Sequence, residues 1–383
     1  MSQTTLDRLK LMLRPAGGGV YVVSTGLSEQ QALQRQLYQA DDEAEIELAW
    51  HQTIERALNS ESDQSKVIVL GCPSDTGAGF TRGANLAPAQ LRSHLMNHHP
   101  SHPLISSHAL DIGDVRVVPQ LLSAEMLSSA QELATATALY GNHPLASTLP
   151  VAPLDITYNV LELILGFERS SALTPLVIGG DHSVAWPAFK AAFDRWEKSG
   201  RAKIGLLHFD AHTDLLSERL GIKYCFATWA WHANQLLGQD GRLVQVGIRA
   251  SGRDRSHWEK SCGVRQYWST EVRERGSVEV AEELISRFEA LGVNALYVSN
   301  DIDGTDEAFA SATGTPEPGG LRPDEVDEIT RRVGERFPLI GADLVEVAPP
   351  LSRLPGEPQR TFDTAALYLK TLSELALKRK PIF

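Results

Sequence analysis

Three short apolar segments of the sequence each end in acidic residues or histidines, and this repeated arrangement most constrains the fold. With the polar residues that follow them, the segments are 175–183, 204–214 and 295–304. Apolar runs of this length, bounded by polar residues, are typical of strands buried in a parallel sheet. Because the carboxyl ends of such strands open on one crevice, we expect the acids and histidines to converge there.

Four aspartates from these segments would then stand close together. They are Asp210, Asp214, Asp301 and Asp303. In a partly dry site their charges would repel one another, and each carboxylate would tend to bind a proton. Two divalent cations would balance the four charges, and His182 and His212 would add neutral nitrogen ligands. A ligand set of mainly carboxylate with some imidazole suits manganese, and nickel, cobalt or zinc less decisively.

The chemistry predicted from this ligand set is hydrolysis. Two metal ions about 3.5–4 Å apart can share a hydroxide and make it a nucleophile at neutral pH. Side chains alternate along an extended segment, so Asp210, His212 and Asp214 would point to one side. Taken alone, an Asp-x-His or Asp-x-Asp pair is more often a helix cap or a turn. Their repetition after three apolar segments favours a metal centre.

The composition argues against several other classes of protein. A formal net charge of -12 disfavours nucleic acid and anionic membranes as partners. No stretch reaches the roughly 18 apolar residues of a membrane span, and the amino terminus lacks the apolar core of a signal peptide. The three cysteines, Cys72, Cys225 and Cys262, lack metal-type spacing and indicate reduced thiols. We therefore expect a soluble, cytoplasmic protein.

The chain divides by pattern into two parts. Residues 1–65 are predicted to be an N-terminal helical extension outside the sheet, with a polar linker at 59–65. Apolar residues recur there at helical spacing, namely Ile46, Trp50, Ile54 and Leu58. Residues 66–383 alternate strands with helices, which predicts an α/β catalytic domain in three layers, a mainly parallel sheet with helices on both faces. The glycine-rich loop 71–83 is either a rim of the site or a plain connection.

Five segments of the second part, in order, resemble the ureohydrolase family. They are Gly179–Ser183, Asp210–Asp214, Asp301–Gly304, Gly314–Leu321 and Val345–Val347. The family contains arginases, agmatinases and related hydrolases of guanidino compounds. The resemblance implies an arginase-like α/β fold, often oligomeric, with a dinuclear metal centre.

The resemblance also implies a role for each matching residue. One metal would be held by His182, Asp210, Asp214 and Asp301. The other would be held by Asp210, His212, Asp301 and Asp303, so that Asp210 and Asp301 bridge. Glu346 matches the carboxylate that receives the substrate guanidinium, whose N–H fork suits a carboxylate. Metal-bound hydroxide would attack the guanidinium carbon and release urea with an amine or ammonia.

Two departures from the family pattern bear on the substrate. Where many members carry His-Gly-Thr, this chain has Phe226-Ala227-Thr228, so the usual proton-shuttle histidine is missing. The leaving group would then be protonated by Asp214 or Asp301, by water, or by His232. A histidine between aromatic residues is more often a hydrogen-bonded packing residue.

The second departure follows Arg249, where arginases carry an aspartate that reads the amino-acid end of their substrate. Here Ala250 follows, which disfavours L-arginine. Phe226, Trp229 and Trp231 could line a compact pocket and attract a guanidinium by cation–π contact, with Thr228 beside them. Packing of the two tryptophans in the core is an equal alternative.

These features most resemble the guanidine hydrolase branch, which is associated with nickel. The predicted reaction is hydrolysis of free guanidine to urea and ammonia with two Ni²⁺ or Mn²⁺ ions. Agmatine or a guanidino acid is the near alternative, followed by a non-catalytic metal-binding paralogue. A single-zinc deacetylase-type enzyme would need fewer ligands. Expected partners are a small guanidinium substrate and copies of this chain in a trimer or hexamer, with metal-insertion proteins as a further candidate.

Overall fold

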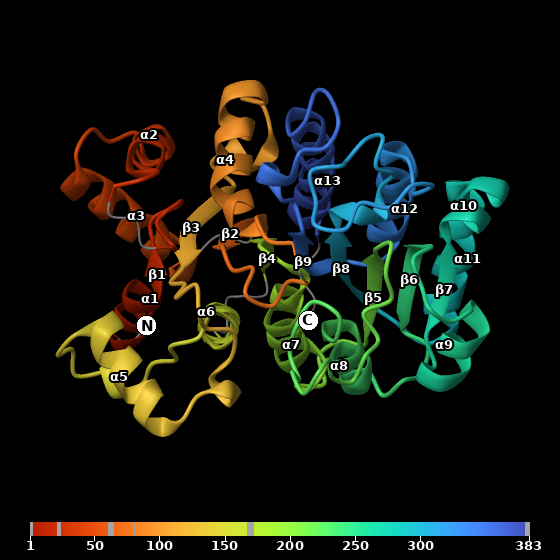
Figure 1. Ribbon diagram of the computed structural model, residues 1–383, viewed down its shortest axis with the longest axis horizontal. Helices are drawn as coiled ribbons and strands as arrows, with labels where there is room; N and C mark the ends of the chain where they lie inside the picture. Colours follow the sequence, from red (N-terminus) through yellow and green to blue (C-terminus); the bar gives the residue numbers. More distant parts are fainter. Residues whose placement is uncertain (1–2, 21–23, 60–64, 80, 167–171, 380–383) are drawn as a thin grey trace.

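Within the described residues, a nine-stranded sheet organises the chain, with strand order β1-β3-β2-β4-β9-β8-β5-β6-β7 (Figure 1). The computed structural model describes residues 3–20, 24–59, 65–79, 81–166 and 172–379. The strands are β1 Leu13–Arg14, β2 Lys66–Cys72, β3 Ala109–Val115, β4 Leu173–Gly179, β5 Ile204–Phe209, β6 Leu243–Ile248, β7 Arg265–Trp268, β8 Ala295–Asp301 and β9 Leu339–Val345. Every pairing is parallel except that of β1, which runs antiparallel to β3.

Helices cover both faces of this sheet, so the predicted three-layer α/β fold is confirmed. On one face lie α4 Ala87–His98, α10 Ser269–Arg275, α11 Ser277–Ala290, α12 Pro323–Arg336 and α13 Gln359–Lys378. On the other lie α1 Gln3–Met12, α6 Pro153–Leu165, α7 Ala185–Trp196, α8 Trp229–Leu236 and α9 Arg255–Cys262. Figure 1 shows the two helical layers above and below the strands. The remaining helices are α2 Leu27–Tyr38, α3 Glu43–Leu58 and α5 Ser129–Tyr140.

The two layers arise because successive side chains of a strand point to opposite faces. In β2, Val67 and Val69 join the hydrophobic cluster beneath α4 and α13. Ile68 and Leu70 join the cluster on the α6 and α7 side. The central strands are therefore apolar on both faces, as is usual in parallel sheets covered by helices.

The N-terminal segment is mainly helical, as predicted, and packs against the β3 edge of the sheet. Trp50 of α3 is buried and donates its indole N–H to the carbonyl of Ile112, at 2.8 Å. The expectation that this segment lies wholly outside the sheet is wrong for Leu13 and Arg14, because they form the edge strand β1. Most of the predicted linker, residues 60–64, lies outside the described residues. The division into extension and catalytic domain stays a prediction.

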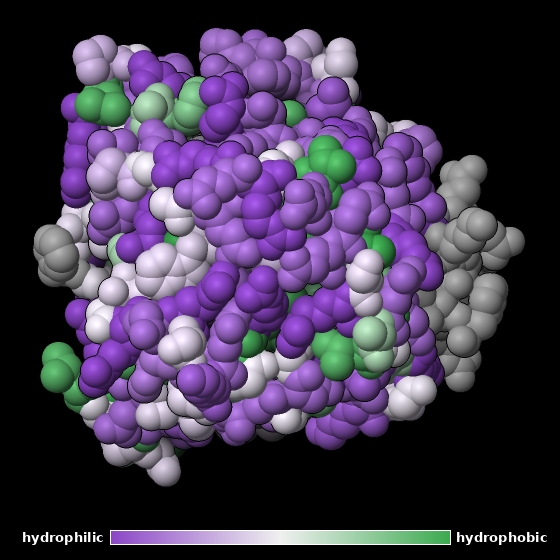
Figure 2. Space-filling model, turned by 90° about the vertical axis from the view of Figure 1, so that its right-hand side faces the viewer, coloured by the Kyte–Doolittle hydropathy of each residue, from purple (hydrophilic) through white to green (hydrophobic). Residues whose placement is uncertain are grey.

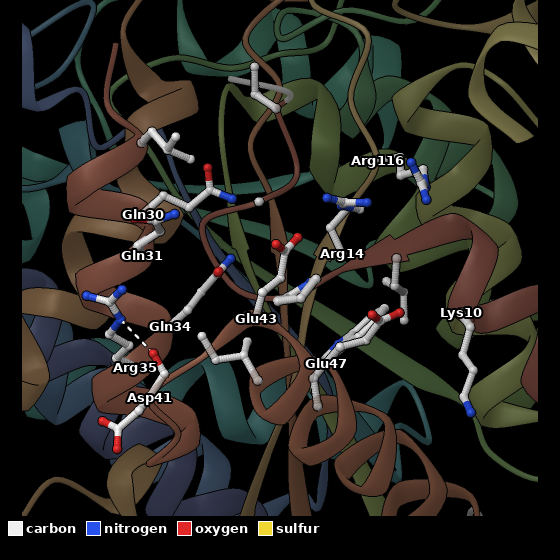
Figure 3. A pocket seen from close by; sticks show the side chains of 17 residues that line it. Lys10, Arg14, Gln30, Gln31, Gln34, Arg35, Asp41, Glu43, Glu47 and Arg116 are labelled. Carbon is white, nitrogen blue, oxygen red and sulfur yellow. Dashed lines mark hydrogen bonds between the residues drawn. The ribbon is translucent and has the colours of Figure 1, made fainter. Parts of the chain in front are cut away.

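A polar cavity of about 360 Å³ separates part of this segment from the sheet edge. Figure 3 shows Gln30 and Gln34 of α2 on one side of it, with Arg14 and Arg116 on the other. Glu43 of α3 also lines the cavity and lies between these two groups in the figure. The lining shares no residue with the candidate site, so we treat the cavity as a feature of the N-terminal packing.

The opposite end of the molecule, formed by β7, α10 and α11, has a mainly hydrophilic surface with scattered apolar patches (Figure 2). Arg265 and Arg275 form ion pairs there with Glu271 and Glu283. Among the described residues, no helix combines the length and the apolar character that a membrane crossing requires.

Candidate active site

Four neighbouring strands at the centre of the sheet carry the candidate residues at their carboxyl ends. Across the sheet these strands follow one another in the order β4, β9, β8, β5. His182 follows β4, Glu346 follows β9, Asp301 ends β8 and Asp210 follows β5. Since the strands are parallel, all four side chains start from the same edge, and the structure brings them together as a cluster.

Hydrogen bonds fix the tautomer of His182 and leave one ring nitrogen free. The hydroxyl of Ser299 donates to Asp343 Oδ1 at 2.6 Å, so it accepts from His182 Nε2, at 3.0 Å. Tyr297 donates to the other oxygen of Asp343, at 2.8 Å. His182 Nδ1 is buried and has no hydrogen-bond partner among the described residues. A histidine whose one N–H is held by a hydrogen bond presents its other nitrogen as a metal ligand.

Three carboxylates surround this free nitrogen. His182 Nδ1 lies 3.2 Å from Asp210 Oδ2, 3.2 Å from Asp214 Oδ2 and 3.1 Å from Asp301 Oδ2. Metal–ligand bonds near 2.0–2.2 Å give ligand–ligand distances of roughly 3.3–3.6 Å in a tetrahedral arrangement. The three separations from Nδ1 are close to this range, and the ligand atoms of His182, Asp210 and Asp214 all lie within 4.8 Å of one another.

A second group of ligand atoms adjoins the first. His212 Nδ1 lies 3.1 Å from Asp303 Oδ2 and 3.4 Å from Asp210 Oδ1. Asp210 thus directs one oxygen to each group, as a bridging ligand does. Asp301 Oδ1 accepts from the Asp303 N–H at 2.9 Å, so this residue is also a helix cap, and its bridging role stays a prediction.

The cluster carries more negative charge than its own histidines balance. Burial lowers the pKa of His212, but Asp303 and Asp210 outweigh it and raise that pKa to about 12. Burial, followed by Asp303 and Asp210, raises the pKa of Asp301 well above its usual range. Divalent cations relieve both effects, because they replace the protons that the cluster would otherwise bind. The donor set and the free His182 nitrogen thus form a His/Asp cluster that is able to hold a metal ion.

The loop after β5, rather than an extended segment, makes the central ligands converge. Strand β5 ends at Phe209, and Asp214 adopts a left-handed backbone with φ of 50°. Asp210 Oδ1 accepts from the His212 N–H at 2.6 Å, which closes a tight turn. The expectation of alternating side chains on an extended segment is wrong here.

His208 belongs to the cluster, although the sequence analysis did not name it. Its Nε2 lies 2.9 Å from Asp210 Oδ2. The spacing of two residues to Asp210 could have revealed it, since residues i and i+2 of a strand share a face.

A chain of hydrogen bonds across three strands sets the tautomer of His208. The indole of Trp268 can only donate, and it donates to Gln266 Oε1 at 3.0 Å. Gln266 Nε2 then donates to Gln245 Oε1 at 2.8 Å, and Gln245 Nε2 donates to His208 Nδ1 at 3.0 Å. His208 must therefore carry its proton on Nε2 and donate it to Asp210. It orients that ligand instead of presenting a lone pair to a metal.

Trp229 lies behind the metal ligands. Its side chain is fully buried, and its indole N–H donates to Asp214 Oδ2 at 3.1 Å. Its ring centroid is 4.6 Å from that of His182 and 4.8 Å from that of His208. This position agrees with the core-packing alternative for Trp229 rather than with a pocket lining.

The other predicted contacts occupy the segment before and within α8. Phe226 is half-buried and lines an open cavity of about 590 Å³, where the Arg219 guanidinium stacks 4.8 Å above its ring. Thr228 is buried and donates to the carbonyl of Lys223 at 2.8 Å. Trp231 is half-buried, and its backbone N–H donates to the Asp214 carbonyl at 3.2 Å.

His232 hydrogen-bonds the same Lys223 carbonyl, at 2.9 Å from Nε2. Its ring packs on Tyr224 and Trp186, with centroids 4.8 Å and 5.4 Å away. Burial lowers the pKa of His232 and favours the neutral ring. These contacts describe a packing residue, and its role in proton transfer stays a prediction.

Glu346 faces the cluster from the end of β9, in a left-handed backbone with φ of 62°. Its Oε1 accepts from the backbone N–H of His182 at 2.8 Å. A side chain at Gly314 would reach 3.7 Å from its Oε2, so the glycine leaves room beside that oxygen. Burial, then the charge of Asp181, raises the pKa of Glu346 well above its usual range. A cation bound at Oε2 would relieve this cost.

Comparison with known proteins places these residues in a wider context. Residues 65–373 match the family profile described as "Arginase family". Guanidinobutyrase from Pseudomonas aeruginosa is 29% identical over 307 residues, which cover 76% of this chain and 81% of that protein. The mitochondrial guanidino acid hydrolase of Homo sapiens is 30% identical over 292 residues, with 73% and 71% covered.

The fold has close counterparts among solved structures. Proclavaminate amidino hydrolase from Streptomyces clavuligerus superimposes with a TM-score of 0.62 at 27% identity, covering 82% of this chain and 92% of that one. The span matched by the family profile contains every candidate residue from His182 to Glu346.

Proposed function

The chain belongs to the arginase family of metal-dependent ureohydrolases, and we propose that its substrate is free guanidine, which it hydrolyses to urea and ammonia. The C–N bond of the guanidinium breaks, a C–O bond forms from water, and the leaving nitrogen gains a proton. We propose Ni²⁺ or Mn²⁺ as the working ions. Two such ions, when bound, lower the pKa of water and so supply the nucleophile.

The position of Glu346 carries this proposal. One carboxylate oxygen accepts from the His182 N–H, and the other lies beside Gly314, where an added Cβ would stand 3.7 Å from it. A guanidinium is planar and directs parallel N–H groups at a carboxylate. A guanidinium bound there would also balance the negative charge of Glu346, which is buried and forms no ion pair with another described side chain. The substrate carbon would then stand beside the metal ligands that follow β4 and β8.

Two observations favour a substrate without a charged tail. Arg249 donates to backbone carbonyls, among them those of Asp303 at 2.6 Å and Glu317 at 2.8 Å, so its guanidinium is committed to the fold. Ala250 donates its backbone N–H to the carbonyl of Ala211 at 3.0 Å, and its side chain carries no charge that could bind the amino-acid group of a substrate.

The chain's own residues would hold the proton that the leaving group needs. Phe226 cannot transfer a proton, so we assign this role to Asp214 or Asp301. Both carboxylates lie beside the proposed metal position, Asp214 at 3.2 Å and Asp301 at 3.1 Å from His182 Nδ1, so either could pass a proton from water to the leaving nitrogen.

A longer guanidino compound is the second candidate. The cavity of about 590 Å³ beside Phe226 favours it, because this volume could accept a tail. Relatives named guanidinobutyrase and guanidino acid hydrolase motivate testing 4-guanidinobutyrate and agmatine as substrates.

A urea-release assay tests the proposal. The purified protein is loaded separately with Mn²⁺ and Ni²⁺ and assayed with guanidine, agmatine, 4-guanidinobutyrate and L-arginine. Urea from guanidine alone supports the compact pocket and identifies the ion. Urea from a longer substrate alone refutes guanidine but keeps the chemistry. Full metal loading without urea from any substrate would make the chain a non-catalytic paralogue.

Glu346→Gln is the matched control for substrate binding. It keeps the shape of the side chain and removes its charge, so metal content should stay unchanged while KM rises or kcat falls. An unchanged substrate profile would remove Glu346 from the binding role.

A further inference from the structure

A second group of side chains of metal-ligating types lies between α4 and α13, apart from the four central strands. Two histidines at the end of α4 share one oxygen of Asp363 in α13. His94 Nε2 is 2.9 Å and His99 Nε2 is 3.2 Å from Asp363 Oδ1. All three ligand atoms lie within 4.8 Å of one another. The helices pack side by side, as Figure 1 shows, so the group joins two elements distant in sequence.

The spacing of these atoms suits a cation as well as it suits hydrogen bonds. Bonds of about 2.0–2.2 Å from a metal to nitrogen and oxygen place tetrahedral ligands roughly 3.3–3.6 Å apart. The two nitrogen–oxygen separations of 2.9 Å and 3.2 Å are slightly shorter than this spacing, and the two nitrogens lie within 4.8 Å of each other. Each ring must move its proton from Nε2 to Nδ1, a change of tautomer that leaves the imidazole neutral.

The packing of His94 and the position of His99 at a helix end both favour metal binding. His94 is buried, and its ring packs 5.2 Å from that of Phe362, which holds the imidazole in place. His99 caps the C-terminus of α4, where the helix dipole favours positive charge.

We propose that His94, His99 and Asp363 form a divalent-metal site additional to the active-site cluster, with water completing the coordination. The side chains of His99 and Asp363 are 37% and 61% exposed, so a cation can enter and leave from solvent. Two imidazoles and one carboxylate select Zn²⁺ or Ni²⁺ over Mn²⁺. The carboxylate-rich central cluster admits Mn²⁺ more readily, so the two places differ in metal preference.

Metal counting on the full chain tests the proposal. The protein is dialysed to equilibrium against Zn²⁺ and, separately, Mn²⁺, and bound metal per chain is measured by mass spectrometry. We expect His99→Gln and Asp363→Asn each to bind one Zn²⁺ fewer than the unmodified chain. Their Mn²⁺ content should not change. The control His257→Gln, which alters an exposed histidine on α9, should bind as much Zn²⁺ as the unmodified chain.

The outcomes separate this site from the proposed active site. Equal Zn²⁺ content in the unmodified chain and both variants overturns the proposal, whatever the enzyme hydrolyses. Loss of Mn²⁺ in the two variants also overturns it, since the effect would then reach the central cluster. Because both altered side chains reach solvent, we expect the variants to fold, and circular dichroism checks this.

Discussion

The buried hydrogen bond from Trp229 to Asp214 makes a quantitative prediction. Trp229→Phe keeps an aromatic ring beside His182 and His208 but removes the indole N–H, which lies 3.1 Å from Asp214 Oδ2. The same oxygen lies 3.2 Å from His182 Nδ1 and would face the metal. Without its donor, Asp214 loses the contact that fixes its rotamer.

The magnitude follows from the position of this bond. Removing a partner that orients a metal ligand typically weakens metal binding 10–100-fold, or roughly 1.4–2.8 kcal/mol. A hydrogen bond to a charged group contributes about 1.5–3 kcal/mol, which agrees with that range. We therefore expect the dissociation constant of the ion next to Asp214 to rise about 10–100-fold.

Competition with a chromophoric chelator measures this constant for Mn²⁺ or Ni²⁺. Trp231→Phe is the matched control, because Trp231 approaches Asp214 through its backbone N–H, which the substitution keeps. The control should leave metal affinity unchanged, and any contact of Trp231 with substrate would show as a change in KM. Equal metal affinity in Trp229→Phe and the unmodified protein would refute the assigned role of the indole.

Three further substitutions probe other parts of the structure. Asp301→Ala should release metal and abolish urea formation, because it removes a carboxylate 3.1 Å from His182 Nδ1; normal metal content by elemental analysis would contradict this. Phe226→His should change turnover of at least one guanidino substrate by adding a group that transfers protons, and unchanged rates for all would show that position 226 is not the shuttle position. Arg92→Met should lower the free energy of unfolding by about 3–5 kcal/mol, because it leaves a buried charge unpaired. That charge is on Asp114, which now lies 2.5 Å from the Arg92 guanidinium. Urea denaturation measures this loss, and one below about 1 kcal/mol would be too small for a buried charge left unpaired.

Local pattern was sufficient to predict most strands and the ligand-bearing turns. The apolar runs before Asp210 and Asp301 are strands because β-branched and apolar residues suit a sheet buried on both faces. The sequence pattern did not predict two strands, β7 and β1. Strand β7, Arg265–Trp268, is short and half polar, and β1 has two residues. Strands this short lack a period long enough to recognise, and only their pairing with β6 and β3 defines them.

The candidate site was likewise predictable in its residue types and less so in its contacts. Trp229 could have lined a pocket or packed in the core, and the residues beside it in the sequence do not decide between these. The choice depends on the loop that carries Asp214, whose left-handed backbone turns the carboxylate toward the indole. His208 was overlooked because it lies within an apolar run, where a histidine is usually a packing residue.

Residue type and apolar period can be read from neighbouring residues, so they identify the candidate metal ligands and the strands that these follow. The order of β4, β9, β8 and β5 in the sheet, which brings His182, Asp210, Asp301 and Glu346 to one place, is visible only in the folded chain. Strand order and the tautomers of His182 and His208 depend on partners distant in sequence, Ser299 and Gln245 among them. Pairing between distant segments is a cooperative property of the whole sheet, and no local window of sequence contains it.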